Sequence, residues 1–125
     1  MAAEPETICV LDDDTSVLKA VGRLLCSAGL GIVAFNEPPL FLQYAETHEI
    51  SLAIIDIWMP EVNGIEVQRR LRSIAPNTPV IMMAGRGEPA LRSAALARGA
   101  AACLDKPFEG EILLASIRTA LCARS

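Results

Sequence analysis

The chain has 125 residues, of which 52% are hydrophobic, and it carries a formal net charge of −4. This length corresponds to one domain with room for a sizeable apolar core. The acidic balance gives no electrostatic footprint for nucleic acid, and no apolar run approaches the roughly 18 residues of a membrane span. The N-terminus does not resemble a signal peptide, so we expect a soluble, cytoplasmic protein.

The first half of the chain predicts two strand–helix units. Residues 7–11 form a short apolar run rich in β-branched side chains, which is typical of a strand. Apolar residues then recur at helical spacing over 17–28, and a glycine ends this predicted helix. Residues 32–35 are the second predicted strand. Two consecutive prolines, which can begin a helix but cannot lie inside one, precede the second predicted helix at 40–46.

The second half of the chain predicts three further strand–helix units. Its strands are continuous apolar runs, and proline or glycine breaks separate them from the helices. In chain order, the elements are predicted over 51–55 (strand), 65–75 (helix), 80–83 (strand), 88–98 (helix), 101–104 (strand) and 111–122 (helix). Pro60 lies in the turn after the first of these strands. Arg86 and Gly87 lie in a glycine-rich loop after the second.

The strands are apolar throughout and do not alternate with polar residues, which is typical of strands buried on both faces. Five such strands alternating with helices predict an α/β fold of the flavodoxin-like (βα)5 type. In this fold a doubly wound, five-stranded parallel sheet is covered by helices on both faces. Such sheets bind ligands beyond the carboxyl ends of their strands. The sequence has no linker, repeat or low-complexity segment, so we expect residues 1–125 to form a single domain.

Charged side chains stand where the predicted strands end. Asp12 and Asp13 follow the first strand, Asp56 follows the third, and Lys106 follows the fifth. Two carboxylates about 5 Å apart repel each other by roughly 3 kcal/mol, so three that converge require a cation. An all-oxygen site suits Mg²⁺ or Mn²⁺, and a carboxylate nucleophile beside such a metal and a lysine is typical of phosphoryl transfer. The alternative is that these acids are solvated loop residues or helix caps, as we expect for Asp14.

The segments LDDD, IIDIWMP, NG, PVIMMAGRG and DKPF, in this order and spacing, resemble a response-regulator receiver domain of two-component signalling. The resemblance covers nearly the whole chain. The stretch DDDTSVLKAVGRLLCSAG, together with Phe35 and Phe41, is similar to the FixJ-like branch. The resemblance implies a sheet order of 2-1-3-4-5 and a cis Lys106–Pro107 bond. It also implies a domain that catalyses its own phosphorylation and dephosphorylation but is not a metabolic enzyme.

The resemblance also implies roles for individual residues. Asp56 would accept a phosphoryl group from a histidine kinase or phosphotransfer protein. Asp13, Asp56 and the backbone carbonyl of Trp58 would bind Mg²⁺ (or Mn²⁺) directly, while Asp12 would act mainly through water. Lys106 would contact a phosphoryl oxygen. A homodimer or an attached output domain would be a further partner, and this segment itself shows no nucleic-acid-binding motif.

Two positions depart from the family pattern. Receivers place Thr or Ser where strand four ends, here Ala84, and usually Tyr or Phe three residues before the lysine, here Cys103. In the family, the hydroxyl bonds the phosphoryl group and the ring rotates into the space that is vacated. A hydrogen bond to a charged group contributes roughly 1.5–3 kcal/mol, so its loss weakens coupling about ten- to a hundredfold. We expect Ala84 to offer its backbone N–H alone, so that phosphorylation of Asp56 shifts the conformation little. The alternative is that Gly85 and Gly87 let the loop move by another route.

Two other functions remain open at this point. The first is a pseudo-receiver, a protein-interaction module that works without phosphorylation, which the residues at 84 and 103 favour. The second is a phosphohydrolase of the haloacid-dehalogenase type, which also uses an aspartate nucleophile. That family requires the pattern Asp-x-Asp-x-Thr, and residues 12–15 lack its second spacer in a chain that is short for such an enzyme.

Leu18 and Leu114 fall outside the apolar stripes of the first and last predicted helices. We therefore expect both side chains to be exposed. Because receivers use these helices as contact surfaces, the two leucines could contact a kinase or a second copy. Single exposed leucines are also common on protein surfaces, which is the alternative reading.

Overall fold

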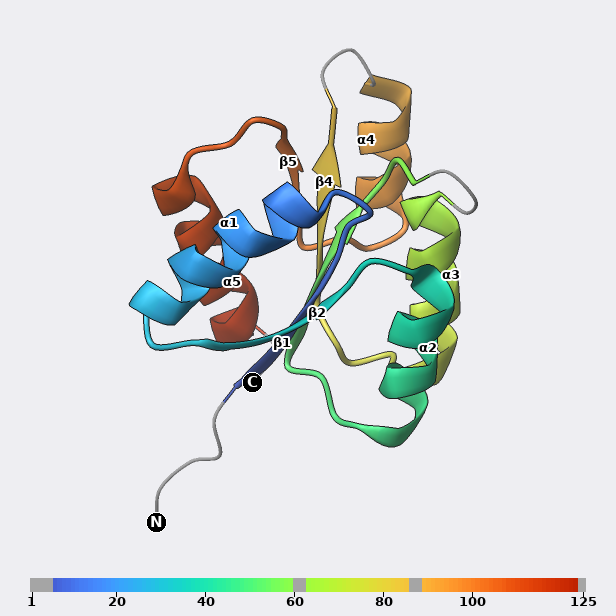
Figure 1. The fold of residues 1–125 in the computed structure, drawn as a ribbon. Helices are drawn as coiled ribbons and strands as arrows, with labels where there is room; N and C mark the ends of the chain where they lie inside the picture. The colour runs from blue at the N-terminus through green and yellow to red at the C-terminus, as the bar shows by residue number, and fades with distance from the viewer. Residues whose placement is uncertain (1–5, 60–62, 86–88, 124–125) are drawn as a thin grey trace.

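A computed structural model describes residues 6–59, 63–85 and 89–123. Within these ranges, strands and helices alternate along the chain (Figure 1). In chain order they are β1 (Thr7–Leu11), α1 (Thr15–Ser27), β2 (Gly31–Phe35), α2 (Pro38–Thr47), β3 (Leu52–Asp56), α3 (Gly64–Ile74), β4 (Val80–Ala84), α4 (Pro89–Ala97), β5 (Ala102–Asp105) and α5 (Gly110–Ala123). The predicted order is confirmed, with ends displaced by one or two residues. Pro60, Arg86 and Gly87 of the predicted turn and loop lie outside the described residues.

The five strands form one parallel sheet in the order β2-β1-β3-β4-β5. Helices α1 and α5 cover one face of this sheet, and α2, α3 and α4 cover the other (Figure 1). The predicted flavodoxin-like α/β architecture is therefore confirmed, as is the cis Lys106–Pro107 bond. No helix among the described residues has both the length and the apolar content needed to cross a membrane.

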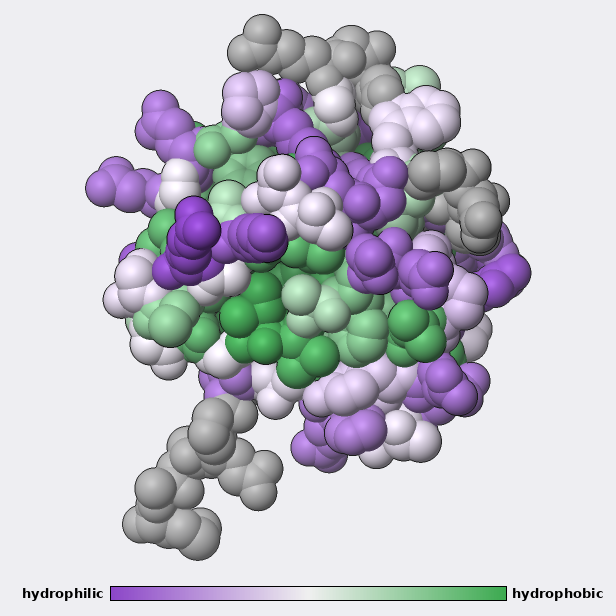
Figure 2. All heavy atoms as spheres, in the orientation of Figure 1, coloured by the Kyte–Doolittle hydropathy of each residue, from purple (hydrophilic) through white to green (hydrophobic). Residues whose placement is uncertain are grey.

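Successive strand residues contribute to the two faces of the core in turn, as the pleat of a strand requires. Ile8 and Val10 of β1 pack with α1 and α5, whereas Cys9 and Leu11 pack with α2, α3 and α4. Every residue of β3 and β4 is buried, because both strands lie inside the sheet. Strand β2 is an edge, and apolar side chains gather at the surface over it, between α1 and α2 (Figure 2). The buried centre of the sheet gives β1, β3 and β4 a rigid setting for the residues at their carboxyl ends.

The prediction that Leu18 and Leu114 are exposed is wrong. Both side chains are partly buried and pack against the core between the sheet, α1 and α5. Helical periodicity gives the direction of a side chain but not how far the core extends around it. On α5, Ile112 is exposed instead, at 49%.

Candidate functional site

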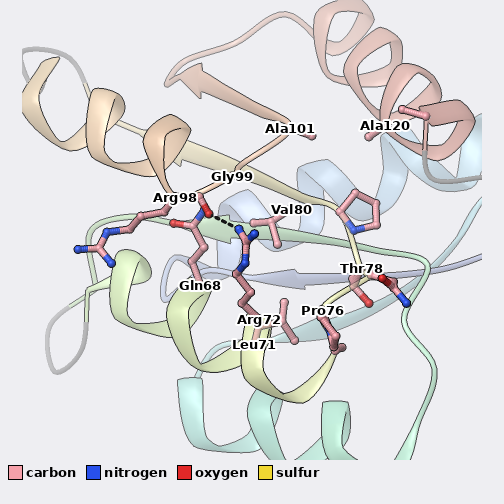
Figure 3. A pocket seen from close by; sticks show the side chains of 14 residues that line it. Gln68, Leu71, Arg72, Pro76, Thr78, Val80, Arg98, Gly99, Ala101 and Ala120 are labelled. Atoms are coloured by element: carbon pink, nitrogen blue, oxygen red, sulfur yellow. Dashed lines mark hydrogen bonds between the residues drawn. The ribbon is translucent and has the colours of Figure 1, made fainter.

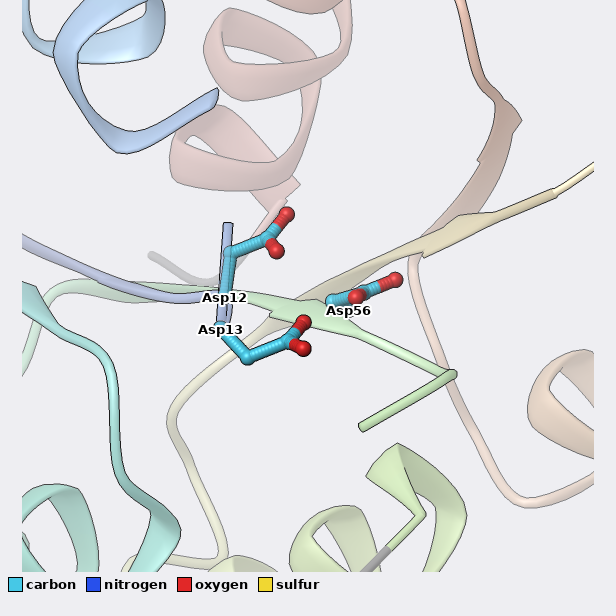
Figure 4. Close-up of side chains that lie close together, drawn as sticks. All are labelled: Asp12, Asp13 and Asp56. Atoms are coloured by element: carbon cyan, nitrogen blue, oxygen red, sulfur yellow. The ribbon is translucent and has the colours of Figure 1, made fainter. Parts of the chain in front are cut away.

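Three carboxylates meet at the carboxyl end of the sheet (Figure 4). Asp12 and Asp13 follow β1, and Asp56 is the last residue of β3, the strand beside it. One carboxylate oxygen from each residue lies within 4.8 Å of the other two. Asp12 is fully buried and Asp56 is 4% exposed, whereas Asp13 is exposed to solvent. The structure thus brings together the three acids that the sequence singled out.

Lys106 approaches these carboxylates from the end of β5. Its Nζ donates a hydrogen bond to Oδ2 of Asp12 at 2.7 Å and lies 3.3 Å from Oδ1 of Asp56. The other oxygen of Asp12 accepts a hydrogen bond from the backbone N–H of Asp14 at 2.9 Å. Both oxygens of Asp12 are therefore engaged, and this buried carboxylate holds the ammonium group of Lys106 beside Asp56. Asp14, as predicted, also caps α1 through its side chain.

The surroundings of Asp56 raise its pKa to about 6. Burial is the main cause and the charge of Asp12 adds to it, while Lys106 and the backbone N–H of Trp58 act in the opposite direction. Burial alone would lower the pKa of Lys106, but its hydrogen bond and charge interaction with Asp12 outweigh this and raise it. At neutral pH the site therefore contains an ionised Asp56 next to a fully charged lysine.

The start of α3 lies directly against the peptide unit that follows Asp56. The backbone N–H of Gly64 donates to the carbonyl of Ile57 at 2.6 Å, and Asn63 caps the helix by accepting from Glu66 N–H. A Cβ atom at Gly64 would lie 2.8 Å from Cα of Ile57 and 2.9 Å from the carbonyl carbon of Asp56. In the sequence, Gly64 follows Asn63 and looks like an ordinary turn glycine, so this close approach is not apparent there. The glycine lets α3 set the position of the Asp56 backbone.

Replacing Gly64 with alanine is expected to lower the free energy of unfolding by about 2 kcal/mol, because the new methyl group overlaps backbone atoms that cannot move aside. The matched control is Gly22→Ala in α1, where the added Cβ would make an ordinary contact 3.7 Å from Ile32. That variant is expected to gain about 0.5–1 kcal/mol from helix propensity. Urea denaturation of both variants tests the difference, and equal effects would refute the close-approach argument.

The two departures from the family pattern lie together in the core. Ala84 ends β4 and is 1% exposed, and Cys103 in β5 is 4% exposed. The register pairs Met82 with Cys103 and Ala84 with Asp105, so residues 84 and 103 lie on the same face of the sheet. Burial raises the pKa of the Cys103 thiol. Where receivers usually have the hydroxyl of Thr or Ser, this chain has the buried methyl group of Ala84. Where they usually have an aromatic ring, it has the small buried thiol of Cys103.

Comparison with known proteins assigns the family. A model of the response regulator receiver domain matches residues 8–118. The chain belongs to this family. The response regulator protein TodT of Pseudomonas putida is 36% identical over 121 residues, which are 97% of this chain and 53% of that protein. The transcriptional regulatory protein FixJ of Bradyrhizobium diazoefficiens is 33% identical over 114 residues, which are 91% of this chain and 56% of that protein. This receiver domain thus spans about half the length of the curated relatives it matches.

Solved structures agree with this assignment. A CheY-like response regulator receiver domain protein from Methanospirillum hungatei superposes with a TM-score of 0.91 at 26% identity, covering 97% of both chains. Full-length FixJ from B. japonicum superposes with a TM-score of 0.91 at 31% identity, covering 98% of this chain and 61% of that one. The protein is therefore a receiver domain of the kind found in two-component response regulators, with FixJ-like relatives.

Proposed function

We propose that this receiver accepts a phosphoryl group on Asp56 from the phosphohistidine of a histidine kinase or phosphotransfer protein. The observation that carries the proposal is the buried Asp56 carboxylate, with Lys106 on one side and two further aspartates within 4.8 Å. Residues 1–125 would act as one receiver domain, and an output domain or a second copy would receive the signal. The domain would promote its own phosphorylation and dephosphorylation and would have no metabolic substrate.

The residues at the site fit Mg²⁺, or Mn²⁺ in its place, because three carboxylates supply the hard oxygen ligands that these ions prefer. Asp13, Asp56 and the backbone carbonyl of Trp58 would hold the ion, and Asp12 would contact it through water. When bound, the ion supplies positive charge that offsets the negative charge of the phosphoryl oxygens. A bound cation would offset the electrostatic repulsion among the three carboxylates, which favours binding.

The residues of the chain would perform the transfer as follows. A carboxylate oxygen of Asp56 attacks the phosphorus atom, the bond from phosphorus to the donor imidazole breaks, and the imidazole leaves with its electron pair. The ammonium group of Lys106, already held by Asp12 at 2.7 Å, would bind a phosphoryl oxygen. Ala84 would offer its backbone N–H to another. Water later attacks the phosphorus atom, the bond from phosphorus to the Asp56 oxygen breaks, and inorganic phosphate leaves as the carboxylate of Asp56 is restored.

Intact-mass spectrometry after incubation with acetyl phosphate and Mg²⁺ tests this proposal. A gain of about 80 Da, corresponding to one phosphoryl group, is expected in the wild-type chain and should be absent from Asp56→Asn. No gain in the wild type would favour a pseudo-receiver, a protein-interaction module that acts without phosphorylation. The observation favouring that second candidate is the pair of non-polar replacements at Ala84 and Cys103.

The affinity for Mg²⁺ is expected to fall at acidic pH, because only the ionised form of Asp56 is a ligand and its pKa is about 6. Below that pH the apparent affinity should drop by roughly tenfold per pH unit as a proton competes with the metal. Trp58 is the only tryptophan and lies two residues from Asp56, so its fluorescence can report the titration. In Asp56→Asn the step near pH 6 should disappear. Equal wild-type affinities at pH 5 and pH 7.5 would contradict this expectation.

Phosphorylation is expected to change the conformation only near the site, because no hydroxyl at Ala84 and no ring at Cys103 can carry the change to α4 and β5. The missing hydrogen bond corresponds to a roughly ten- to hundredfold weaker coupling. Beryllofluoride, which mimics the phosphoryl group, should shift the NMR signals of Asp13, Trp58 and Lys106. Signals from the last turn of α4 should stay in place. Large shifts throughout α4 and β5 would show that the signal travels by another route.

A further inference from the structure

A groove runs between α3 and α4 at the edge of the sheet opposite to the carboxylates. It consists of two hollows of about 330 Å³ and 450 Å³, and Gln68, Arg72 and Arg98 line both of them. Figure 3 shows the side chains that line the 330 Å³ hollow. Val80, the first residue of β4, lines the 330 Å³ hollow, whereas Asp56 is the last residue of the parallel strand β3. The groove is therefore separate from the proposed phosphorylation site.

The groove is basic although the chain as a whole is acidic. Three arginines, Arg69, Arg72 and Arg98, line the hollows, and no described aspartate or glutamate does. Arg69 is paired with Glu66 on its own helix. Among the described residues, no carboxylate lies within ion-pair distance of Arg72 or Arg98. In a chain with a net charge of −4, this is a local concentration of uncompensated positive charge.

Arg72 is held in place although it is exposed. Its Nη1 donates to the carbonyl of Arg98 at 2.7 Å, at the C-terminal end of α4. Gly99, which has a φ of 98°, leaves room for this guanidinium group, because a Cβ there would overlap Nη1. The remaining guanidinium donors of Arg72 are thus presented in a fixed orientation, which reduces the entropy lost on binding.

The wall between the two hollows contains an unsatisfied acceptor. Gln68 is 3% exposed, and its Nε2 donates to the carbonyl of Ala95 at 3.1 Å. That contact fixes the orientation of the amide, since the reverse orientation would place two oxygens together. Its Oε1 is closed to solvent and has no hydrogen-bond partner among the described residues. Held by Ala95, the Gln68 side chain therefore forms a fixed wall of both hollows.

We propose that this groove binds an extended, acidic peptide segment of a partner protein. Its carboxylates would pair with Arg72 and Arg98. An aliphatic side chain would enter the hollow that Leu71 and Val80 line. Because the two hollows share Gln68, Arg72 and Arg98 in their linings and together extend from Val80 to Arg69, the groove suits an extended chain better than a compact anion.

The test uses a fluorescein-labelled peptide in which glutamate alternates with leucine, and the same peptide with glutamine in place of glutamate. Fluorescence anisotropy should show saturable binding of the acidic peptide, and added salt should weaken that binding. In NMR spectra, the bound peptide should shift the side-chain amide signals of Gln68. Arg98→Gln should weaken binding roughly tenfold, as expected for one charge-assisted hydrogen bond. Arg118→Gln makes the same charge change on the exposed side of α5 and should leave binding unchanged.

Arg98 is the better test position, because its guanidinium makes no hydrogen bond to another described residue and its loss should not disturb folding. A thermal melt of each variant verifies this. Equal binding of the two peptides, equal binding to Arg98→Gln and Arg118→Gln, or no saturable binding would overturn the proposal. No phosphoryl donor is present, so the result is independent of whether Asp56 is phosphorylated.

Discussion

Replacing Lys106 with methionine should lower the free energy of unfolding by about 3 kcal/mol at neutral pH, because it leaves buried carboxylates without their counter-charge. Lys106 contacts both Asp12, which is fully buried, and Asp56, which is 4% exposed. Methionine keeps the length and apolar stem of the side chain and removes only the ammonium group. Urea denaturation at neutral pH measures the loss. Lys19→Met, which removes the only other lysine from an exposed position of α1, is the control and should change little.

The loss of unfolding free energy in Lys106→Met should depend on pH and on Mg²⁺. Asp56 already has a pKa of about 6 with the lysine present, and without it this pKa should rise further. Lowering the pH below about 6 protonates the carboxyl group, which then needs no counter-charge, so the variant should recover stability relative to the wild type. Mg²⁺ should also restore part of the stability. A loss that is the same at every pH and with or without Mg²⁺ would mean that packing, and not charge, accounts for it.

Asp56→Asn is expected to stabilise the protein at neutral pH by about 2 kcal/mol while abolishing phosphorylation. The folded chain raises the pKa of Asp56 from 3.8 to about 6, which means that folding disfavours its ionised form. A carboxyl group with a raised folded-state pKa reduces stability as the pH rises from about 4 to about 6. Asparagine has nearly the same shape and carries no charge, so it removes this penalty.

The stability gained in Asp56→Asn should therefore be present at pH 7. It should vanish below about pH 4, where the wild-type carboxyl group is neutral in both the folded and the unfolded state. Thermal or urea unfolding at both pH values measures it. Asp105→Asn is the control, because this exposed carboxylate forms a surface ion pair with Arg92 and is not part of the cluster. An asparagine variant less stable than the wild type at neutral pH would show that ionised Asp56 contributes to the fold.

The fold was predictable because five continuous apolar strands separated by helices are compatible with few architectures. Continuous apolar runs such as 52–55 and 80–83 are typical of strands in the middle of a parallel sheet, which is where β3 and β4 lie. The order of the strands came from the resemblance to receivers and not from periodicity. The convergence of Asp12, Asp56 and Lys106 followed from the shared edge at which parallel strands end.

Features that depend on the packing of one element against another could not be predicted. Gly64 looks like any turn glycine in the sequence, and only the placement of α3 against Asp56 shows why a side chain would not fit. Gln68 reads as an ordinary polar helix residue, but it is buried against a carbonyl 27 positions away in α4. The predicted exposure of Leu18 and Leu114 was wrong for the same reason, because periodicity gives the direction of a side chain and not what packs against it.

The most direct test of the central claim locates the phosphoryl group on the chain. After incubation with acetyl phosphate and Mg²⁺, borohydride reduces an aspartyl phosphate to homoserine, and tandem mass spectrometry of the digested protein identifies the position. We predict homoserine at Asp56, dependent on Mg²⁺, with Asp12 and Asp13 unmodified. Modification at Asp12 or Asp13, or none at Asp56 with Mg²⁺ present, would contradict the assignment of this site.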